Sequence, residues 1–233
     1  MTRNFCFSRA FTLIELIVVL AVIAILMSMV YPMYMNMSER AKGTRDMSNL
    51  RQIGMATQAY SNDNDGVLFS PATQWSSQLE QNKKYLSVWR ILQSPFDKRP
   101  PGEGGGAATP ISYGVNANIY PGGVVGPPMP ASKITNPTGF ILFAPAQASG
   151  ATVTFSGWAN SPAPGVTVAG IGGNTVQSSP GGNVINGTHN SRRLINALFA
   201  DLHCETMTWL AFASTTSATL GEPNQWTPYL PYP

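Results

Sequence analysis

An unbroken apolar run near the N-terminus constrains this chain more than any other feature. Residues 11–30 contain thirteen Leu, Ile, Val or Phe residues, and Glu15 is the only charged residue among them. At about 1.5 Å per residue, a helix of this length spans roughly 30 Å, the thickness of the hydrocarbon core of a bilayer. Each such side chain contributes about −0.3 to −0.6 kcal/mol to insertion, which together outweigh the roughly 2.5–3.5 kcal/mol cost of one central charge. We therefore expect a membrane-spanning helix.

A secretory signal peptide is the alternative, because it also combines a basic start with an apolar stretch. Signal peptides have a shorter apolar region that is followed by a small-residue cleavage site, whereas residues 28–33 are Ser-Met-Val-Tyr-Pro-Met. We expect the segment to be retained. Arg3 and Arg9 precede it and favour a cytoplasmic N-terminus, although basic residues after the run weaken that preference.

The rest of the chain has a different composition. Of the 22 glycines and 19 prolines, all but Gly43, Gly54 and Pro32 lie at or after Gly66, which indicates an apolar rod followed by a loop-rich body. The formal net charge is only +3, and no long cluster of Lys and Arg is present. The sequence therefore implies no nucleic-acid partner.

The helix is expected to continue beyond the membrane as an amphipathic segment. Apolar or small residues recur at three- and four-residue steps: Met37, Ala41, Met47, Leu50, Ile53 or Gly54, Thr57 and Tyr60. Charged residues are assigned to the other faces: Arg40, Lys42, Arg45, Asp46 and Arg51. Pro32 lacks a backbone donor and is expected to bend the helix near the membrane exit. The polar cluster at 61–66 has the turn and C-cap chemistry that ends a helix.

The C-terminal body predicts short elements separated by loops. Residues 75–93 predict a short helix with a buried side formed by Leu79, Tyr85, Leu86, Trp89 and Leu92. Residues 139–145 predict a buried strand, 151–155 are a further candidate strand, and 194–212 predict two strands joined at Asp201-Leu202. Segments 100–130 and 156–188 are expected to be mostly loop. The predicted fold class is α+β, with a long N-terminal helix packed on a small antiparallel β-sheet.

The N-terminal run resembles a known family. The stretch RAFTLIELIVVLAVIAIL is similar to the N-terminus of type IV prepilins and type II secretion pseudopilins. The resemblance implies a pilin-like fold, cleavage between Ala10 and Phe11 by a prepilin peptidase, and methylation of the new Phe11 amine. The family usually has glycine before the cut, where this chain has Ala10.

The resemblance also implies a role for Glu15. An ionisable group inside a membrane segment is costly and normally has a partner. Cleavage before Phe11 would create a cationic amine, and the Glu15 carboxylate could pair with the amine of a neighbouring subunit and set the stagger between helices. The alternative is a neutral Glu15 that faces lipid or head groups.

A second resemblance covers the body of the chain. Many pseudopilin-like bacterial proteins carry a Tyr-to-Gly segment after the helix, a Cys-Pro-x-Asp segment, a Ser-Tyr-x-x-Asn segment, and a His followed after nine residues by Asp-Gly. The matching segments here are 60–66, 94–97, 112–116 and 140–144, followed by His189 and Asp201. Ser94 replaces the cysteine, Leu202 replaces the turn glycine, and eleven residues separate His189 from Asp201 (201 − 189 − 1).

This last region contains the best case for an enzyme. His189, Asp201, His203 and Glu205 are metal-ligand types, and the last three would share one face of a continuous strand. The favoured alternative is that Asp201 caps a hairpin turn while His203 and Glu205 are exposed. We expect no enzymatic activity, no metal and no cofactor.

These features together predict a pilin-like structural subunit of the bacterial inner membrane. The expected organisation is a leader at 1–10, an assembly helix at 11–35, its amphipathic continuation at 36–65 and an extracytoplasmic β-rich domain at 66–233. Expected partners are pilin-like subunits, the prepilin peptidase, an inner-membrane assembly platform and membrane lipid. The alternative is a membrane-tethered extracytoplasmic enzyme or binding domain that uses the helix only as an anchor.

Overall fold

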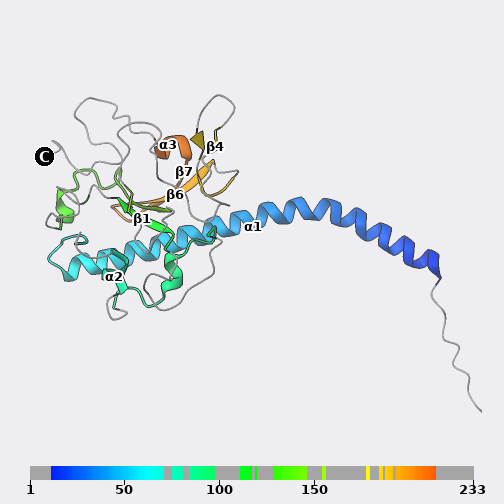
Figure 1. Cartoon of the computed structure of the whole chain (residues 1–233), viewed down its shortest axis with the longest axis horizontal. Helices are drawn as coiled ribbons and strands as arrows, with labels where there is room; N and C mark the ends of the chain where they lie inside the picture. Colours follow the sequence, from blue (N-terminus) through cyan, green and yellow to red (C-terminus); the bar gives the residue numbers. More distant parts are fainter. Residues whose placement is uncertain are drawn as a thin grey trace, which may run out of the picture. The chain divides into compact units, whose positions relative to one another are not determined.

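The computed structural model of the protein describes residues 12–70, 75–80, 84–97, 111–116, 119, 128–145, 154–155, 177–178, 184–185, 187–190 and 193–213. The chain divides into two compact units, Met1–Ala41 and Lys42–Pro233. One long helix, α1 (Leu13–Asp63), begins in the first unit and ends in the second (Figure 1).

In the first unit, α1 exposes its apolar side chains on all sides. An 18-residue window of α1 has a mean hydropathy of 3.0 and no buried residue, so its length and composition suit a membrane span. The helix continues through Pro32 without interruption. Pro32 has no N–H for the carbonyl of Ser28, and the Ser28 hydroxyl donates to the carbonyl of Ile25 at 2.7 Å. The bend at Pro32 stays a prediction.

In the second unit, one face of α1 is buried. The buried side chains are Asp46, Asn49, Leu50, Ile53, Gly54, Ala56, Thr57, Tyr60 and Ser61. The predicted apolar face is therefore confirmed from Leu50 to Tyr60. Two expectations are wrong: Met37 and Ala41 are exposed, and Asp46 lies on the buried face and not among the surface charges. Helical periodicity places a charged residue such as Asp46 on the surface, because a buried charge without partners is costly. It takes no account of hydrogen-bond donors that distant segments of the chain supply.

The helix α1 ends within the polar cluster at 61–66, as predicted. Asp65 and Gly66 adopt positive φ angles of 55° and 75°, and the Gly66 N–H donates to the carbonyl of Ser61 at 2.8 Å. This is the six-to-one hydrogen bond of a Schellman motif. The Asn64 side chain donates to the carbonyl of Tyr60 at 2.7 Å. Both contacts satisfy carbonyls that the helix itself leaves without a partner.

The described strands form a five-stranded sheet with the order β3-β1-β2-β6-β7. Its strands are β1 (Tyr113–Asn116), β2 (Ile141–Pro145), β3 (Thr154–Phe155), β6 (Leu194–Phe199) and β7 (Cys204–Thr208). The four strands β1, β2, β6 and β7 pair antiparallel, as predicted, and β3 pairs parallel to β1. A separate antiparallel pair joins β4 (Gln177–Ser178) and β5 (Val184–Ile185).

Three short elements differ from the expectation. The strand β1 and the β4–β5 pair lie in segments expected to be mostly loop, and the segment after β7 forms the helix α3 (Trp209–Ala213) and not the end of a strand. In each case the element is too short for its sequence pattern to be distinctive. The predicted helical region at 75–93 contains two short helices, α2 (Trp75–Glu80) and the 3₁₀ helix η2 (Trp89–Leu92).

The hairpin between β6 and β7 turns at Asp201-Leu202, as predicted. The Asp201 carboxylate accepts a hydrogen bond of 3.1 Å from the His203 N–H, so it caps the turn. Leu202 has a φ of 72°, a conformation that favours glycine. A non-glycine residue there costs about 1–2 kcal/mol, and the packing of the Leu202 side chain near Gly54 offsets part of that cost.

The core lies on both sides of β2. All five residues of β2 are buried, which requires cover on each face of the sheet. One contact is aromatic, because the rings of Trp75 and Phe143 lie 4.9 Å apart in an edge-on arrangement. Another is the close approach of α1 to β6, where a Cβ on Gly54 would lie 3.1 Å from Leu198 Cδ2.

Candidate functional site

The carboxylate of Glu15 is bound to the first residue of its own helix. The Thr12 N–H and the Thr12 hydroxyl both donate to Glu15 Oε2, at 2.9 Å and 2.7 Å. In return, the Glu15 N–H donates to the Thr12 hydroxyl oxygen at 3.4 Å. This reciprocal arrangement is a capping box, with Thr12 as N-cap and Glu15 at the third helical position.

The capping box explains how a carboxylate is tolerated at the start of an apolar helix. The first N–H groups of a helix have no partner within the helix, and an unsatisfied N–H costs several kcal/mol in a hydrocarbon environment. Glu15 satisfies one of these groups and places negative charge at the positive end of the helix dipole. The Thr-x-x-Glu spacing was visible in the sequence and could have predicted this contact.

The predicted processing site lies outside the described residues. Ala10 and Phe11 both precede Thr12, the first residue that the structure describes. Cleavage between Ala10 and Phe11 and methylation of Phe11 therefore stay predictions. They would leave the Thr12–Glu15 capping box intact, with the new amine one residue before Thr12.

A second polar site surrounds Asp46, which has no solvent-exposed surface. Asp46 Oδ1 accepts hydrogen bonds from the Ser94 hydroxyl at 2.5 Å and from the Tyr113 hydroxyl at 2.7 Å. Asp46 Oδ2 accepts a hydrogen bond of 2.9 Å from the Asn196 amide. We refer to Asp46, Ser94, Tyr113 and Asn196 as the Asp46 centre, which joins α1, the segment after η2, β1 and β6.

The partners of Asp46 are themselves held as donors. The Tyr113 hydroxyl accepts from the Asn49 amide at 3.3 Å, so its own proton is directed to Asp46. The Asn196 amide also donates to the carbonyl of Gly43 at 3.1 Å. The arrangement therefore suits a carboxylate that accepts three hydrogen bonds.

Burial governs the electrostatics of the Asp46 centre. Loss of hydration raises the pKa of Asp46, and the hydrogen bonds from Ser94, Tyr113 and Asn196 lower it by less. Burial and the adjacent Asp46 charge together raise the pKa of Tyr113 well above its usual value. Asp46 has no exposed surface, and its contacts join structural elements.

The Asp46 centre contains residues from two of the sequence motifs. Ser94 begins the segment 94–97, which is closed by a hydrogen bond of 2.9 Å from the Asp97 N–H to the Ser94 carbonyl. The Ser112 hydroxyl donates to the Asp97 carboxylate at 2.6 Å, which links this turn to the start of β1. The two motif segments therefore meet on the buried face of α1.

The described residues do not bring the four candidate metal ligands together. His189 stacks on Phe96, with ring centroids 5.5 Å apart. His203 bonds to Asp201 through its Nδ1 atom, and both side chains are exposed, as is Glu205. Among the described residues, no three His, Cys, Asp or Glu side chains form a group that could hold a metal ion.

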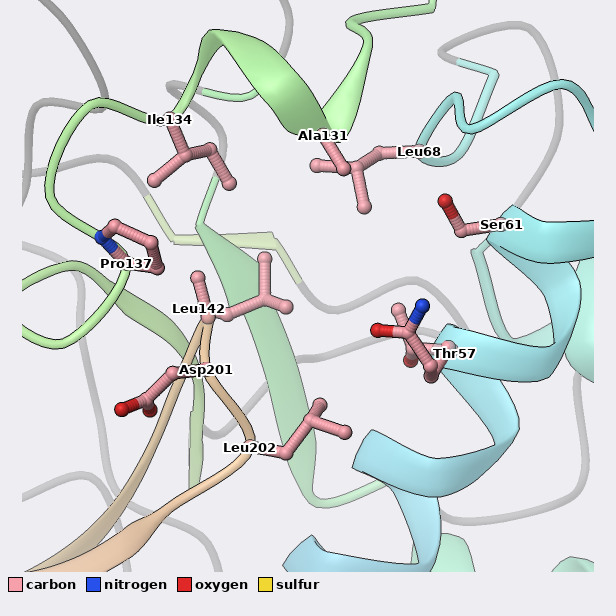
Figure 2. A pocket seen from close by; sticks show the side chains of 11 residues that line it. Thr57, Ser61, Leu68, Ala131, Ile134, Pro137, Leu142, Asp201 and Leu202 are labelled. Carbon is pink, nitrogen blue, oxygen red and sulfur yellow. The ribbon is translucent and has the colours of Figure 1, made fainter.

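A pocket of about 280 Å³ lies between the end of α1, the loop around η4 (Ala131–Lys133), β2 and the β6–β7 turn (Figure 2). Figure 2 shows Leu142 and Leu202 on one side of the pocket and Leu68 and Thr57 on another. The Asp201 carboxylate points away from Leu142 and Leu202 in this view. The Asp201 carboxylate therefore does not face the apolar side chains of this part of the lining.

Comparison with known proteins assigns the N-terminal segment. The prokaryotic N-terminal methylation motif matches residues 7–31, which include the Ala10–Phe11 junction and Glu15. The match supports a type IV prepilin-like N-terminal segment. No curated protein and no solved structure matches the chain.

The N-terminal part of α1 suits a membrane anchor. The matched motif includes the first part of α1, and the same helix has the length and composition of a membrane span. The α+β architecture, with a long apolar helix and a small sheet whose four strands β1, β2, β6 and β7 are antiparallel, agrees with a pilin-like fold. The match ends at residue 31, so it assigns no role to the Asp46 centre or to the pocket.

Proposed function

We propose that the protein is a non-enzymatic structural subunit of a type IV pilus-like filament or a type II secretion pseudopilus. A prepilin peptidase cuts it between Ala10 and Phe11 and methylates Phe11. An inner-membrane assembly platform then adds the subunit to neighbouring pilin-like subunits through α1. The observation that supports the proposal most directly is the methylation motif at residues 7–31.

The proposed orientation is a single pass through the inner membrane, with residues 66–233 outside the cytoplasm. Membrane lipid surrounds the apolar part of α1 before assembly. Its exposed apolar side chains, which include Leu16, Val22 and Leu26, then pack on the helices of neighbouring subunits. In the filament the Glu15 carboxylate pairs with the Phe11 amine of a neighbour.

The capping box makes the pairing mechanism testable. Glutamine at the third helical position still accepts a hydrogen bond in a capping box, so Glu15→Gln keeps this contact but removes the charge. Glu15→Ala removes both. We expect both variants to insert into the membrane and both to be depleted from filaments, measured by shearing filaments from cells and quantifying the subunit. Normal incorporation of Glu15→Gln would reject charge pairing and leave helix capping as the role of Glu15.

The mass of the native N-terminus tests the proposal as a whole. The chain isolated from envelope membranes is expected to begin with a methylated Phe11. The alternative, a membrane-tethered extracytoplasmic domain with α1 as a simple anchor, predicts that residues 1–10 remain attached. An uncut chain found inside a filament would contradict the proposed processing, and an uncut chain found only in the membrane would favour the tethered domain.

A further inference from the structure

The Lys42–Asp63 part of α1 packs on the sheet mainly through apolar side chains. Leu50 and Ile53 have no exposed surface, and Ala56 and Tyr60 are buried near them. Apolar contacts are non-directional. A shift of the helix along its axis by one turn, about 5.4 Å, would exchange apolar or small side chains for one another along this face. The apolar face alone therefore restricts its position through side-chain size and not through directed contacts.

Gly54 supplies one steric constraint on that position. Its missing side chain leaves room for Leu198 of β6 and Leu202 of the turn, whose terminal carbons lie 3.1 Å and 3.3 Å from the site of a Cβ. These neighbours are the ends of flexible side chains, which can adjust. Gly54 therefore restricts the position of the helix without fixing it.

The Asp46 centre supplies a directional constraint. Its three hydrogen bonds to the carboxylate come from Ser94, Tyr113 and Asn196, which belong to three separate segments of the domain. Hydrogen bonds weaken steeply with misalignment and distance. A shift of one turn in either direction would remove all three bonds. A shift that moves Asp46 to the position of Leu50 would also leave the carboxylate buried without these donors.

A buried carboxylate is a costly way to stabilise a helix contact. Replacing buried ionic groups with apolar residues of similar size is often neutral or stabilising, whereas buried polar groups in some proteins select one packing arrangement. The Asp46 centre contains no basic side chain, so hydrogen-bond geometry is its main contribution to the fold. We propose that Asp46 is a register lock: its directed hydrogen bonds select one axial and rotational position of α1 on the sheet. The proposal does not depend on the proposed function.

The distance between α1 and β7 tests the register. Spin labels are attached to cysteines introduced at Met55 and Glu205, which are both exposed, in a full-length chain that carries Cys6→Ser and Cys204→Ser. Pulsed electron spin resonance then measures the distribution of label distances in detergent micelles. The parent chain is expected to show one narrow distribution of label distances. In Asp46→Leu, a second population of distances is expected to appear beside the parent population or to replace it, shifted by up to about 5 Å, one helical turn.

Ile53→Ala is the matched control, because it removes buried apolar contacts of α1 without touching the Asp46 centre. We expect it to keep the single parent distance. An unshifted narrow distance in Asp46→Leu would overturn the proposal, as would an equal shift in Ile53→Ala.

A second variant keeps the test decisive if Asp46→Leu does not fold. The double variant Ser94→Ala/Tyr113→Phe removes two donors and keeps the carboxylate. A broadened or shifted distance in this variant supports the register lock, and an unshifted distance overturns it. Loss of the near-ultraviolet circular dichroism signal in both variants would also overturn it, because the Asp46 centre would then be required for the fold itself and not for the choice of register.

Discussion

The Tyr113 hydroxyl of β1 donates a hydrogen bond of 2.7 Å to the Asp46 carboxylate of α1, across 67 residues of sequence. The bond connects the second half of α1 to the sheet of the globular unit. Both groups are fully buried, so the contact is shielded from water and its loss is not compensated by hydration. The first two predictions concern this pair.

The stability of the globular unit should depend on the ionisation of Asp46. Burial raises the pKa of Asp46 in the folded protein above its unfolded value of about 3.8. The associated stabilisation is fully present below the unfolded pKa and is lost as the pH rises through the folded pKa. Asp46→Asn cannot ionise, so the free energy of unfolding of the wild type, relative to this variant, should fall as the pH rises above 4.

Chemical denaturation of the full-length protein in micelles, followed by tryptophan fluorescence, measures this difference at each pH. Glu205→Gln is the control, because it makes the same chemical change at an exposed site. Its difference from the wild type should vary little with pH. A wild-type advantage over Asp46→Asn that grows with increasing pH would contradict the direction of the pKa shift.

Tyr113→Phe should destabilise the globular unit. It removes a hydrogen bond to a buried charged group, which is worth about 1.5–3 kcal/mol, and it leaves the Asn49 amide without the Tyr113 acceptor. It should also raise the pKa of Asp46 further, because the hydrogen bond from Tyr113 lowers that pKa. Tyr85→Phe is the matched control, since its hydroxyl bonds to Asp63 at an exposed site. Equal free energies of unfolding for the two variants would be inconsistent with a special role of the buried pair.

The two glycines of α1 should respond in opposite ways to a larger side chain. Among the described residues, the nearest side chain to a Cβ on Gly43 is the His189 ring, at 3.9 Å, whereas a Cβ on Gly54 would lie within 3.1–3.3 Å of Leu198 and Leu202. Gly43→Ala should stabilise the protein by about 0.5–1 kcal/mol through helix propensity. Gly54→Val should destabilise it by about 1–3 kcal/mol through overpacking. Thermal unfolding would check the order, and a more stable Gly54→Val would contradict the close packing of α1 on β6.

The buried face of α1 could be predicted from Leu50 to Tyr60 because helical periodicity is a local property of the sequence. The burial of Asp46 could not be predicted in this way. Its donors lie 48, 67 and 150 residues away along the chain, and only tertiary structure brings them to one carboxylate. The sequence motifs at 94–97 and 112–116 indicated that those segments matter but not that they meet on α1.

The strands also could be predicted only where the local sequence pattern is distinctive. The apolar segment at 139–145 predicted β2, and the segment 194–212, with its turn at Asp201-Leu202, predicted β6 and β7. The strand β1 has four residues, one of them Gly114, and it is bounded by glycine- and proline-rich sequence that indicates a loop. It becomes a strand because β2 pairs with it on one side. Pairing partners of this kind are not encoded in the local pattern.

The hydroxyl of Thr12 should stabilise the start of α1. Thr12→Val removes the hydroxyl that donates to Glu15 and accepts from the Glu15 N–H. Loss of such a cap costs about 1 kcal/mol, which corresponds to roughly fivefold faster opening of the first helical turn. Thr12→Ser keeps the hydroxyl and serves as the control. Amide hydrogen exchange in micelles at residues 13–15 measures the effect, and equal exchange rates in the two variants would argue against the capping box.

The thiol of Cys204 should react slowly, and Arg51 should influence its ionisation. Burial raises the pKa of Cys204 to about 11, while the Arg51 guanidinium acts in the opposite direction. Because the thiolate is the reactive form, alkylation at pH 8 should be roughly a hundred times slower than for an ordinary thiol. Because the Arg51 guanidinium lowers the pKa of Cys204, Arg51→Gln should move the midpoint of the rate–pH profile for alkylation to still higher pH. The variant is made in a Cys6→Ser background, so that Cys204 is the thiol that reacts. Arg45→Gln removes an exposed cation that does not act on this thiol, and its midpoint should match that of the parent. An unchanged or lower midpoint in Arg51→Gln would contradict the stabilisation of the Cys204 thiolate by Arg51.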